Sequence, residues 1–151
     1  MAHDILFRGS GVALVTPFDN DNQINFTELE RLIEWHIANH TDAIIVCGTT
    51  GEASTLSESE KKSIFTFSVQ IADGRIPIIA GTGCNDTADT IARSQFAEKA
   101  GADGLLIVTP YYNKCTQKGL IAHYTAIANA VNIPIILYNV PGRTGVTIAP
   151  D

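Results

Sequence analysis

Short apolar runs recur along the chain and alternate with longer amphipathic stretches. Val, Ile and Leu dominate five of these runs, at residues 11–16, 43–47, 77–80, 104–108 and 134–138. Continuous apolar runs are typical of strands that are buried on both faces of a sheet. The interval from one run to the next has room for a strand, a helix and two loops, as a parallel sheet requires. We therefore predict five parallel strands.

The stretches between these runs have the periodicity of amphipathic helices. Two sets of side chains recur at helical spacing: Leu29, Leu32, Ile33, His36 and Ile37, and Leu120, Tyr124, Ile127, Ala128 and Val131. Such spacing places each set on one face of a helix, where it can pack on the sheet. Asn25 with Glu28, and Ser57 with Glu60, have the spacing of N-terminal helix caps. We predict four helices, each covering the sheet with one apolar stripe.

The alternation of strands and helices fits either an open doubly wound sheet or a (β/α) barrel. Polar and glycine-rich clusters follow the C-terminal ends of the strands, at residues 16–17, 48–52, 81–83, 109–112 and 138–139. A barrel draws its active site from the ends of many strands, whereas an open sheet gathers ligand contacts at one switch point. The spread of these clusters over five strand ends favours the (β/α)8 TIM barrel.

The chain is too short to complete such a barrel. A full barrel has eight strands in about 250 residues, whereas this chain has 151 residues. We therefore predict a truncated half-barrel of about five parallel strands and four helices, with residues 1–151 forming the N-terminal part of a single domain. An unclosed sheet exposes two edges and one face, so we expect self-association or poor solubility.

Composition and charge exclude several classes of protein. The chain is 45% hydrophobic and 17% charged, which is the balance of a globular domain, and its formal charge of -6 offers no basic face for nucleic acid. No apolar stretch approaches the roughly 20 residues of a membrane span, and residues 1–8 lack the apolar core of a secretory signal. We expect a cytoplasmic protein that binds neither nucleic acid nor membrane.

The cysteines and histidines lack the spacing of a metal site. Cys47, Cys84 and Cys115 are an odd number, and the four histidines do not cluster beside them. We expect reduced thiols and no metal. The glycine-rich residues 48–52 lack the lysine of a phosphate-binding loop, which argues against a nucleotide, and we expect no cofactor.

Several strand-end residues have chemistry suited to a small carboxylate. Backbone N–H groups and the hydroxyls of Thr49 and Thr50 can form a concave donor site, although a tight turn explains residues 48–52 equally well. Residues 81–83 are better explained as a turn. The guanidinium of Arg143 can fork onto a carboxylate, or it is simply a solvated surface side chain.

Tyrosines and lysines complete the set of candidate residues. The phenols of Tyr111, Tyr112 and Tyr138 can relay protons, with Thr49 as a link between two of them, although packing of the rings at the barrel mouth is the simpler role. The five lysines fall on predicted helices or exposed loops, and we expect all of them to be surface charges: Lys61, Lys62, Lys99, Lys114 and Lys118.

Three motifs together resemble the dihydrodipicolinate synthase family. They are Gly-Thr-Thr-Gly-Glu at 48–52, Thr-Pro-Tyr-Tyr-Asn at 109–113 and Tyr-Asn-Val-Pro-Gly-Arg-Thr-Gly at 138–145, and the similarity runs through essentially all of the chain. Members are (β/α)8 barrels and lyases that condense pyruvate with aspartate semialdehyde on the route to diaminopimelate and lysine. The resemblance implies a class I, aldolase-like mechanism with a lysine Schiff base, and a homotetramer built as a dimer of dimers.

The resemblance also implies roles for individual residues. Thr49, Tyr138 and Tyr112 form a proton relay, with Tyr112 reaching into a neighbouring subunit; Thr49 and Thr50 hold the pyruvate carboxylate. Arg143 receives the carboxylate of the semialdehyde and orients Tyr138. The Schiff-base lysine of the family belongs to the sixth strand, beyond residue 151, so we expect this chain alone to be inactive.

The resemblance extends to regulation by lysine, which inhibits some members at a subunit interface. Asn85 and Tyr111 match that allosteric site. Glu58 and Lys61 stand where the lysine-sensitive pattern has histidines, and a cation at Lys61 repels the ammonium of the ligand. We therefore expect weak feedback inhibition or none.

Two other functions remain open on the sequence. N-acetylneuraminate lyase and other pyruvate-dependent aldolases share the barrel, the lysine and the tyrosine of the fifth strand, but Arg143 favours a second substrate that carries a carboxylate. A noncatalytic half-barrel that serves as a scaffold or assembly partner is the alternative outside enzymes.

Overall fold

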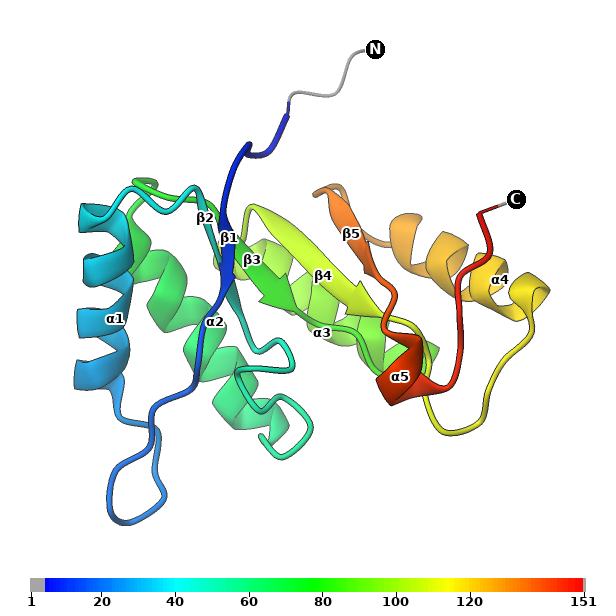
Figure 1. Cartoon of the computed structure of the whole chain (residues 1–151), viewed down its shortest axis with the longest axis horizontal. Coiled ribbons are helices and arrows are strands. Elements are labelled where there is room, and N and C mark those ends of the chain that lie inside the picture. Colours follow the sequence, from blue (N-terminus) through cyan, green and yellow to red (C-terminus); the bar gives the residue numbers. More distant parts are fainter. Residues whose placement is uncertain (1–4, 151) are drawn as a thin grey trace.

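A single parallel sheet organises the chain, and helices cover one of its faces (Figure 1). The structure is a computed structural model and describes residues 5–150. The strands are β1 (Gly11–Ala13), β2 (Ala43–Val46), β3 (Ile78–Gly81), β4 (Gly104–Val108) and β5 (Ile135–Tyr138). Each pairs in parallel with the next in sequence order. This order has no reversal, so it is that of a barrel and excludes the doubly wound sheet.

Four long helices connect or follow the strands, as the hydrophobic pattern predicts. They are α1 (Phe26–Ala38), α2 (Glu58–Ala72), α3 (Thr87–Ala100) and α4 (Gln117–Ala128). A fifth, short helix, α5 (Pro141–Thr144), follows β5 in addition to the four predicted helices. A helix of one turn has too few residues to show a hydrophobic period.

The predicted helix caps are both present. The Asn25 side chain accepts a hydrogen bond from the Glu28 backbone N–H, and Ser57 and Glu60 form a reciprocal capping box. These bonds satisfy backbone N–H groups that have no partner within the helix. The starts of α1 and α2 are therefore fixed by local sequence.

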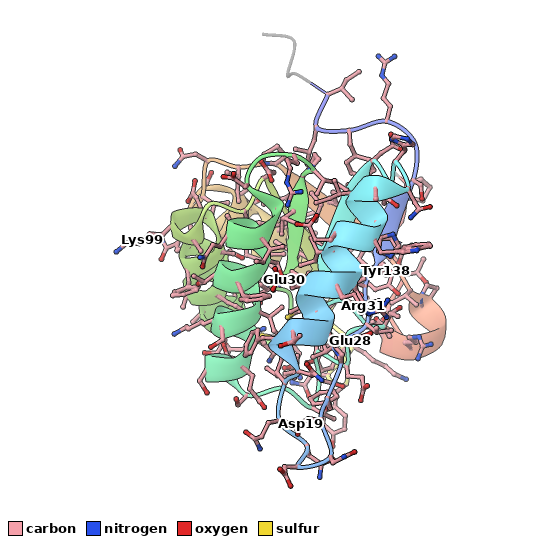
Figure 2. All side chains as sticks on the ribbon, turned by 90° about the vertical axis from the view of Figure 1, so that its left-hand side faces the viewer. Asp19, Glu28, Glu30, Arg31, Lys99 and Tyr138 are labelled. Carbon is pink, nitrogen blue, oxygen red and sulfur yellow. The ribbon has the colours of Figure 1, made fainter. Side chains whose placement is uncertain are left out.

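The hydrophobic core lies between the sheet and the helices. Its largest fully buried side chains include Phe65 and Ile64 of α2, Leu29 of α1, Ile44 of β2 and Leu105 of β4. The solvent face of α1 carries Glu30 and Arg31, which Figure 2 labels, together with the half-exposed Trp35.

The two edge strands are the least covered part of the sheet. Leu137 of β5 is 50% exposed and Val15, just after β1, is 48% exposed. Within residues 5–150 nothing pairs with the outer edges of β1 and β5. The expected self-association of such an open sheet stays a prediction. Among the described helices, none has the length and continuous hydrophobicity that crossing a bilayer requires.

Candidate functional site

A cavity of about 510 Å³ opens where the C-terminal ends of β2 to β5 converge. It brings together Thr49, Tyr138 and Arg143, which belong to the β2–α2 loop, the end of β5 and α5. Asn85 of the β3–α3 loop and Tyr111 of the β4–α4 loop also line it. Side chains from four consecutive strand–helix units therefore face one space, as a parallel barrel geometry dictates.

Two predicted site residues lie outside this cavity. Thr50 is exposed, and Tyr112 is 87% exposed with a backbone φ of 74°. Neither is among the residues that line the cavity. The proposed relay of Thr49, Tyr138 and Tyr112 is thus not assembled within the described chain, and the roles of these residues stay predictions.

The Gly48–Glu52 loop is both a tight turn and part of the cavity wall. Its backbone closes on itself through hydrogen bonds from the Glu52 N–H to the Thr49 oxygen (3.1 Å) and from the Ala53 N–H to the Gly48 oxygen (3.4 Å). The buried Thr16 hydroxyl donates to the Gly51 oxygen at 2.7 Å and ties the loop to the end of β1. The tight turn is therefore confirmed, and the carboxylate-binding role of the loop stays a prediction.

The glycines at 81 and 83 serve a different purpose from the predicted turn. Gly81 ends β3, and a Cβ there would lie 2.1 Å from the backbone oxygen of Cys47. A Cβ on Gly83 would lie 2.5 Å from the backbone nitrogen of Val108. Neither glycine has a positive φ. The turn prediction is wrong, because these glycines permit neighbouring strand ends to approach each other at the cavity.

Lys61 is the exception to the expected surface role of the lysines. It is 8% exposed, lines the cavity, and places its ammonium nitrogen 3.2 Å from Glu58 Oε1. The prediction that all five lysines are surface charges is wrong for this residue. An ammonium three residues beyond a carboxylate on one helix can pair with it, and the turn that carries this pair borders the cavity.

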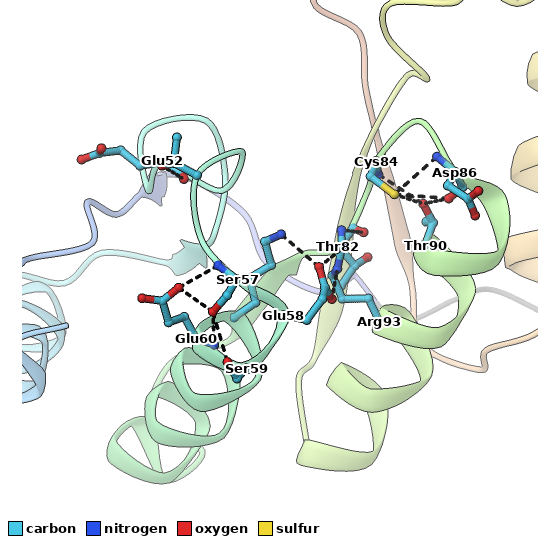
Figure 3. Close-up of polar contacts among 12 residues, drawn as sticks. Glu52, Ser57, Glu58, Ser59, Glu60, Thr82, Cys84, Asp86, Thr90 and Arg93 are labelled. Atoms are coloured by element: carbon cyan, nitrogen blue, oxygen red, sulfur yellow. Dashed lines mark hydrogen bonds and ion pairs between the residues drawn. The ribbon is translucent and has the colours of Figure 1, made fainter. Parts of the chain in front are cut away.

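Arg93 of α3 joins the same pair from the neighbouring helix, as Figure 3 shows. It is 6% exposed, donates from Nε to Glu58 Oε2 at 2.9 Å, and donates from Nη1 to the Thr82 backbone oxygen at 3.0 Å. The hydrogen bond from Arg93 lowers the pKa of the Glu58 carboxyl. Arg93 is not among the residues singled out from the sequence, although an arginine among the small and apolar residues of a helix is a signal that it is paired.

Cys47, directly after β2, has a thiol that is a poor nucleophile. Burial raises the pKa of Cys47 to about 12, so the reactive thiolate is scarce at neutral pH. The three cysteines are all free. Among residues 5–150, no group of three or more His, Cys, Asp or Glu side chains is placed to hold a metal ion.

Arg143 is presented by α5, which buried neighbours hold in place. Thr144 is 5% exposed, and its hydroxyl can donate to the backbone oxygen of either Val140 (3.2 Å) or Val146 (3.0 Å). Gly145 ends the turn with a φ of 68°, a conformation that suits glycine. The residues around Arg143 thus form one helical turn.

Asn85 and Tyr111 meet at the cavity. The Asn85 side-chain nitrogen lies 3.4 Å from the Tyr111 backbone oxygen and donates to it. This contact joins the β3–α3 and β4–α4 loops, and both residues share the cavity with Lys61. The structure therefore groups the two residues expected to form a regulatory site, although it does not test that role.

Comparison with known proteins identifies relatives of about twice this length. The chain is 59% identical over 145 residues to 4-hydroxy-tetrahydrodipicolinate synthase of Clostridium perfringens strain 13, a match that covers 96% of this chain and 50% of that protein. The synthase of Clostridium tetani (strain Massachusetts / E88) is 60% identical over 145 residues, covering 96% of this chain and 49% of that protein. The chain thus spans about half the length of the curated relatives that it matches.

Solved structures agree with these relatives. Dihydrodipicolinate synthase from Aquifex aeolicus superimposes with a TM-score of 0.93 at 50% identity, covering 95% of this chain and 48% of that one. The enzyme from Acinetobacter baumannii, solved with pyruvate, gives a TM-score of 0.92 at 54% identity, covering 93% and 48%. These matches confirm the predicted half of a (β/α)8 barrel. A profile described as "Dihydrodipicolinate synthetase family" matches residues 6–151, and the chain belongs to that family.

Proposed function

We propose that the whole protein containing this chain condenses pyruvate with aspartate semialdehyde, as a 4-hydroxy-tetrahydrodipicolinate synthase of the class I aldolase type. The observation that carries the proposal is the convergence of Thr49, Tyr138 and Arg143 on one cavity. Those residue types provide a hydroxyl, a phenol and a guanidinium for two substrates that each carry a carboxylate. The relatives named above have this activity in their names, and one neighbour is solved with pyruvate.

The residues divide between the two substrates. Thr49 and Thr50 hold the pyruvate carboxylate with hydroxyl and backbone donors, and Arg143 binds the carboxylate of the semialdehyde through its planar fork. Thr49 and Tyr138 pass protons to and from the reacting carbons. Tyr112 completes this relay from a second subunit, a role for which its 87% exposed side chain is available. Such a role requires the homo-oligomer that we propose, a tetramer built as a dimer of dimers in the cytoplasm.

The covalent step needs a neutral amine, and the described residues do not supply one at the cavity. Lys61 is the lysine that lines it, but its ammonium is paired with Glu58 beside Arg93. An ammonium held by a carboxylate has no free electron pair with which to attack a ketone. The proposal therefore assigns the Schiff base to a lysine of the remainder of the whole protein, and the chain alone is inactive.

A trapping experiment tests both parts. The chain alone, and the chain joined to the C-terminal half of the Clostridium perfringens relative, are each incubated with pyruvate and borohydride and then weighed by mass spectrometry. We expect a reduced pyruvyl adduct on the joined protein and no adduct on the chain alone. An adduct on the chain alone, or none on the joined protein, contradicts the corresponding part of the proposal.

A comparison of aspartate semialdehyde with sialic acid tests which substrate the protein uses besides pyruvate. The joined protein should consume aspartate semialdehyde in the presence of pyruvate and should release no pyruvate from sialic acid. Efficient cleavage of sialic acid would assign the protein to the N-acetylneuraminate lyases instead.

Asn85 and Tyr111 are the proposed regulatory residues, and we propose that their site binds lysine weakly. Lys61 and Arg93 line the same cavity, and Glu58 is the carboxylate that both cations already share. The ammonium group of an added lysine therefore meets two cations whose shared carboxylate is already engaged. Asp89 also lines the cavity, and its single carboxylate offsets only part of this repulsion. Calorimetric titration of the joined protein with lysine checks this, and micromolar binding would contradict it.

A further inference from the structure

The segment after α5 is tied to two other elements by side-chain amides. Asn139, directly after β5, accepts a hydrogen bond from the Ile148 N–H at 3.1 Å. Gln117, the first residue of α4, donates from Nε2 to the Thr147 oxygen at 2.8 Å and accepts from the Ala149 N–H at 3.0 Å. One glutamine amide therefore bonds both sides of the same backbone segment. Figure 1 shows this C-terminal segment running back beside α4.

The position of Gln117 is itself fixed. Thr116 caps α4 by accepting from the Gly119 N–H at 3.2 Å, which sets where the helix begins. Upstream in the same loop, the Lys114 side chain lies against Gly145, so that a Cβ on Gly145 would be 3.1 Å from Lys114 Cε. The start of α4 and the loop before it thus contact the chain after Thr144 at two points.

This attachment matters because α5 has little stability of its own. It has four residues, and a helix of one turn does not persist without tertiary support. Upstream α5 is held by β5, and downstream it depends on the anchoring of residues 144–149. Arg143 is exposed and lies between these two supports. The direction of its guanidinium follows from how firmly both supports hold.

We propose that Gln117 and Asn139 are positioning residues that hold α5 in place and thereby aim Arg143 at the second, carboxylate-bearing substrate. This inference rests on the proposed function for the identity of that substrate. It does not place either residue in contact with a reacting atom. It also links the β4–α4 loop, which carries Tyr112, to the turn that carries Arg143, so that two loops of the site keep a constant separation.

Hydrogen exchange on the chain as it stands tests the attachment without any catalysis. In Gln117→Ala, we expect amide exchange in residues 146–149 to accelerate at least fivefold, while the core of α4 is unchanged. Asn139→Ala should accelerate the same region, and Asn139→Asp, which keeps the acceptor oxygen, should restore slow exchange. Gln95→Ala is the matched control, because Gln95 is also exposed and donates to a backbone oxygen, that of Ala130, far from α5. Unchanged exchange in Gln117→Ala would overturn the inference.

Kinetics of the joined protein then test the consequence for the substrate. Gln117→Ala should raise KM for aspartate semialdehyde at least fivefold and leave KM for pyruvate within twofold of the parent, whereas a general structural defect would affect both. If the parent is active and the variant has the same KM for aspartate semialdehyde as the parent, the positioning role is overturned. If the parent itself has no activity, the proposed function fails, and the exchange experiment still supports or overturns the attachment independently.

Discussion

Replacing Glu58 with glutamine should destabilise the chain by about 2 kcal/mol. Two cations that are almost fully buried depend on this one carboxylate: Arg93 is 6% exposed and Lys61 is 8% exposed. Hydrogen bonds to charged groups are worth about 1.5–3 kcal/mol each, and removing the partner of a buried charge costs about 3–5 kcal/mol. The Glu58 side chain is itself 54% exposed, so water replaces part of the lost interaction and the estimate falls below that range.

Urea denaturation followed by circular dichroism measures this change. Glu30→Gln is the control, because Glu30 is exposed on α1, and it should shift stability by less than about 0.5 kcal/mol. A Glu58→Gln variant as stable as this control would refute the reasoning, since it would mean that Arg93 and Lys61 are not dependent on the carboxylate.

The pH dependence of the same difference gives a second test. Arg93 lowers the pKa of Glu58 in the folded chain below its value in the unfolded chain. The stabilisation is therefore complete above the ordinary carboxyl pKa of about 4.3 and is lost as pH falls through the folded-state pKa. The parent and Glu58→Gln should converge in stability at acid pH. A difference that stays constant from neutral pH to pH values well below about 4 would contradict the assignment.

Three further predictions follow from individual sites. Gly81→Ala should destabilise by more than about 3 kcal/mol in urea denaturation because its Cβ would strike the Cys47 oxygen at 2.1 Å, whereas Gly142→Ala, with open space around it, should be nearly neutral. Burial lowers the pKa of His123, so its contribution to stability is complete above about pH 6.5 and declines as pH falls below that value. In His123→Gln, the free energy of unfolding from urea denaturation should therefore depend less on pH over this range than in the parent. Iodoacetamide should label Cys115 much faster than Cys47, whose pKa is raised to about 12, as peptide mapping by mass spectrometry will show.

The strands and long helices could be predicted because their signals are local. The fourth predicted strand coincides with β4, and the caps at Asn25 and Ser57 give the starts of α1 and α2. The short helix α5 escaped because one turn has no period, and the glycines at 81 and 83 were misinterpreted because their neighbours come from other strands. A glycine required for close approach looks the same in sequence as a glycine required for a turn.

In the candidate site too, the residues with a local sequence signal could be predicted and the others could not. Thr49, Tyr138 and Arg143 could be grouped in advance because each lies at or beyond the C-terminal end of a strand, and parallel strands bring these ends to one edge. Gln117 and Arg93 could not, because their contacts join residues that lie about one strand–helix unit apart: Gln117 bonds Thr147 across 30 residues and Arg93 bonds Glu58 across 35. The burial of Lys61 could not either, because its pair with Glu58 is local and does not by itself show that this side chain lines a cavity.

That separation has a physical cause in the architecture. Helices that are neighbours on a parallel sheet are separated in the sequence by one whole strand–helix unit. A side chain that contacts the neighbouring helix therefore has a partner about 30 residues away in the sequence, beyond the reach of any local pattern. The contacts that sequence alone misses in this fold are therefore those between adjacent units, and both the Glu58 cluster and the Gln117 attachment belong to this class. If Glu58→Gln leaves stability unchanged, the contact of Glu58 with Arg93 of the next unit contributes little to the stability of the fold. That result would also weaken the case that Gln117, by a contact of the same kind, stabilises α5.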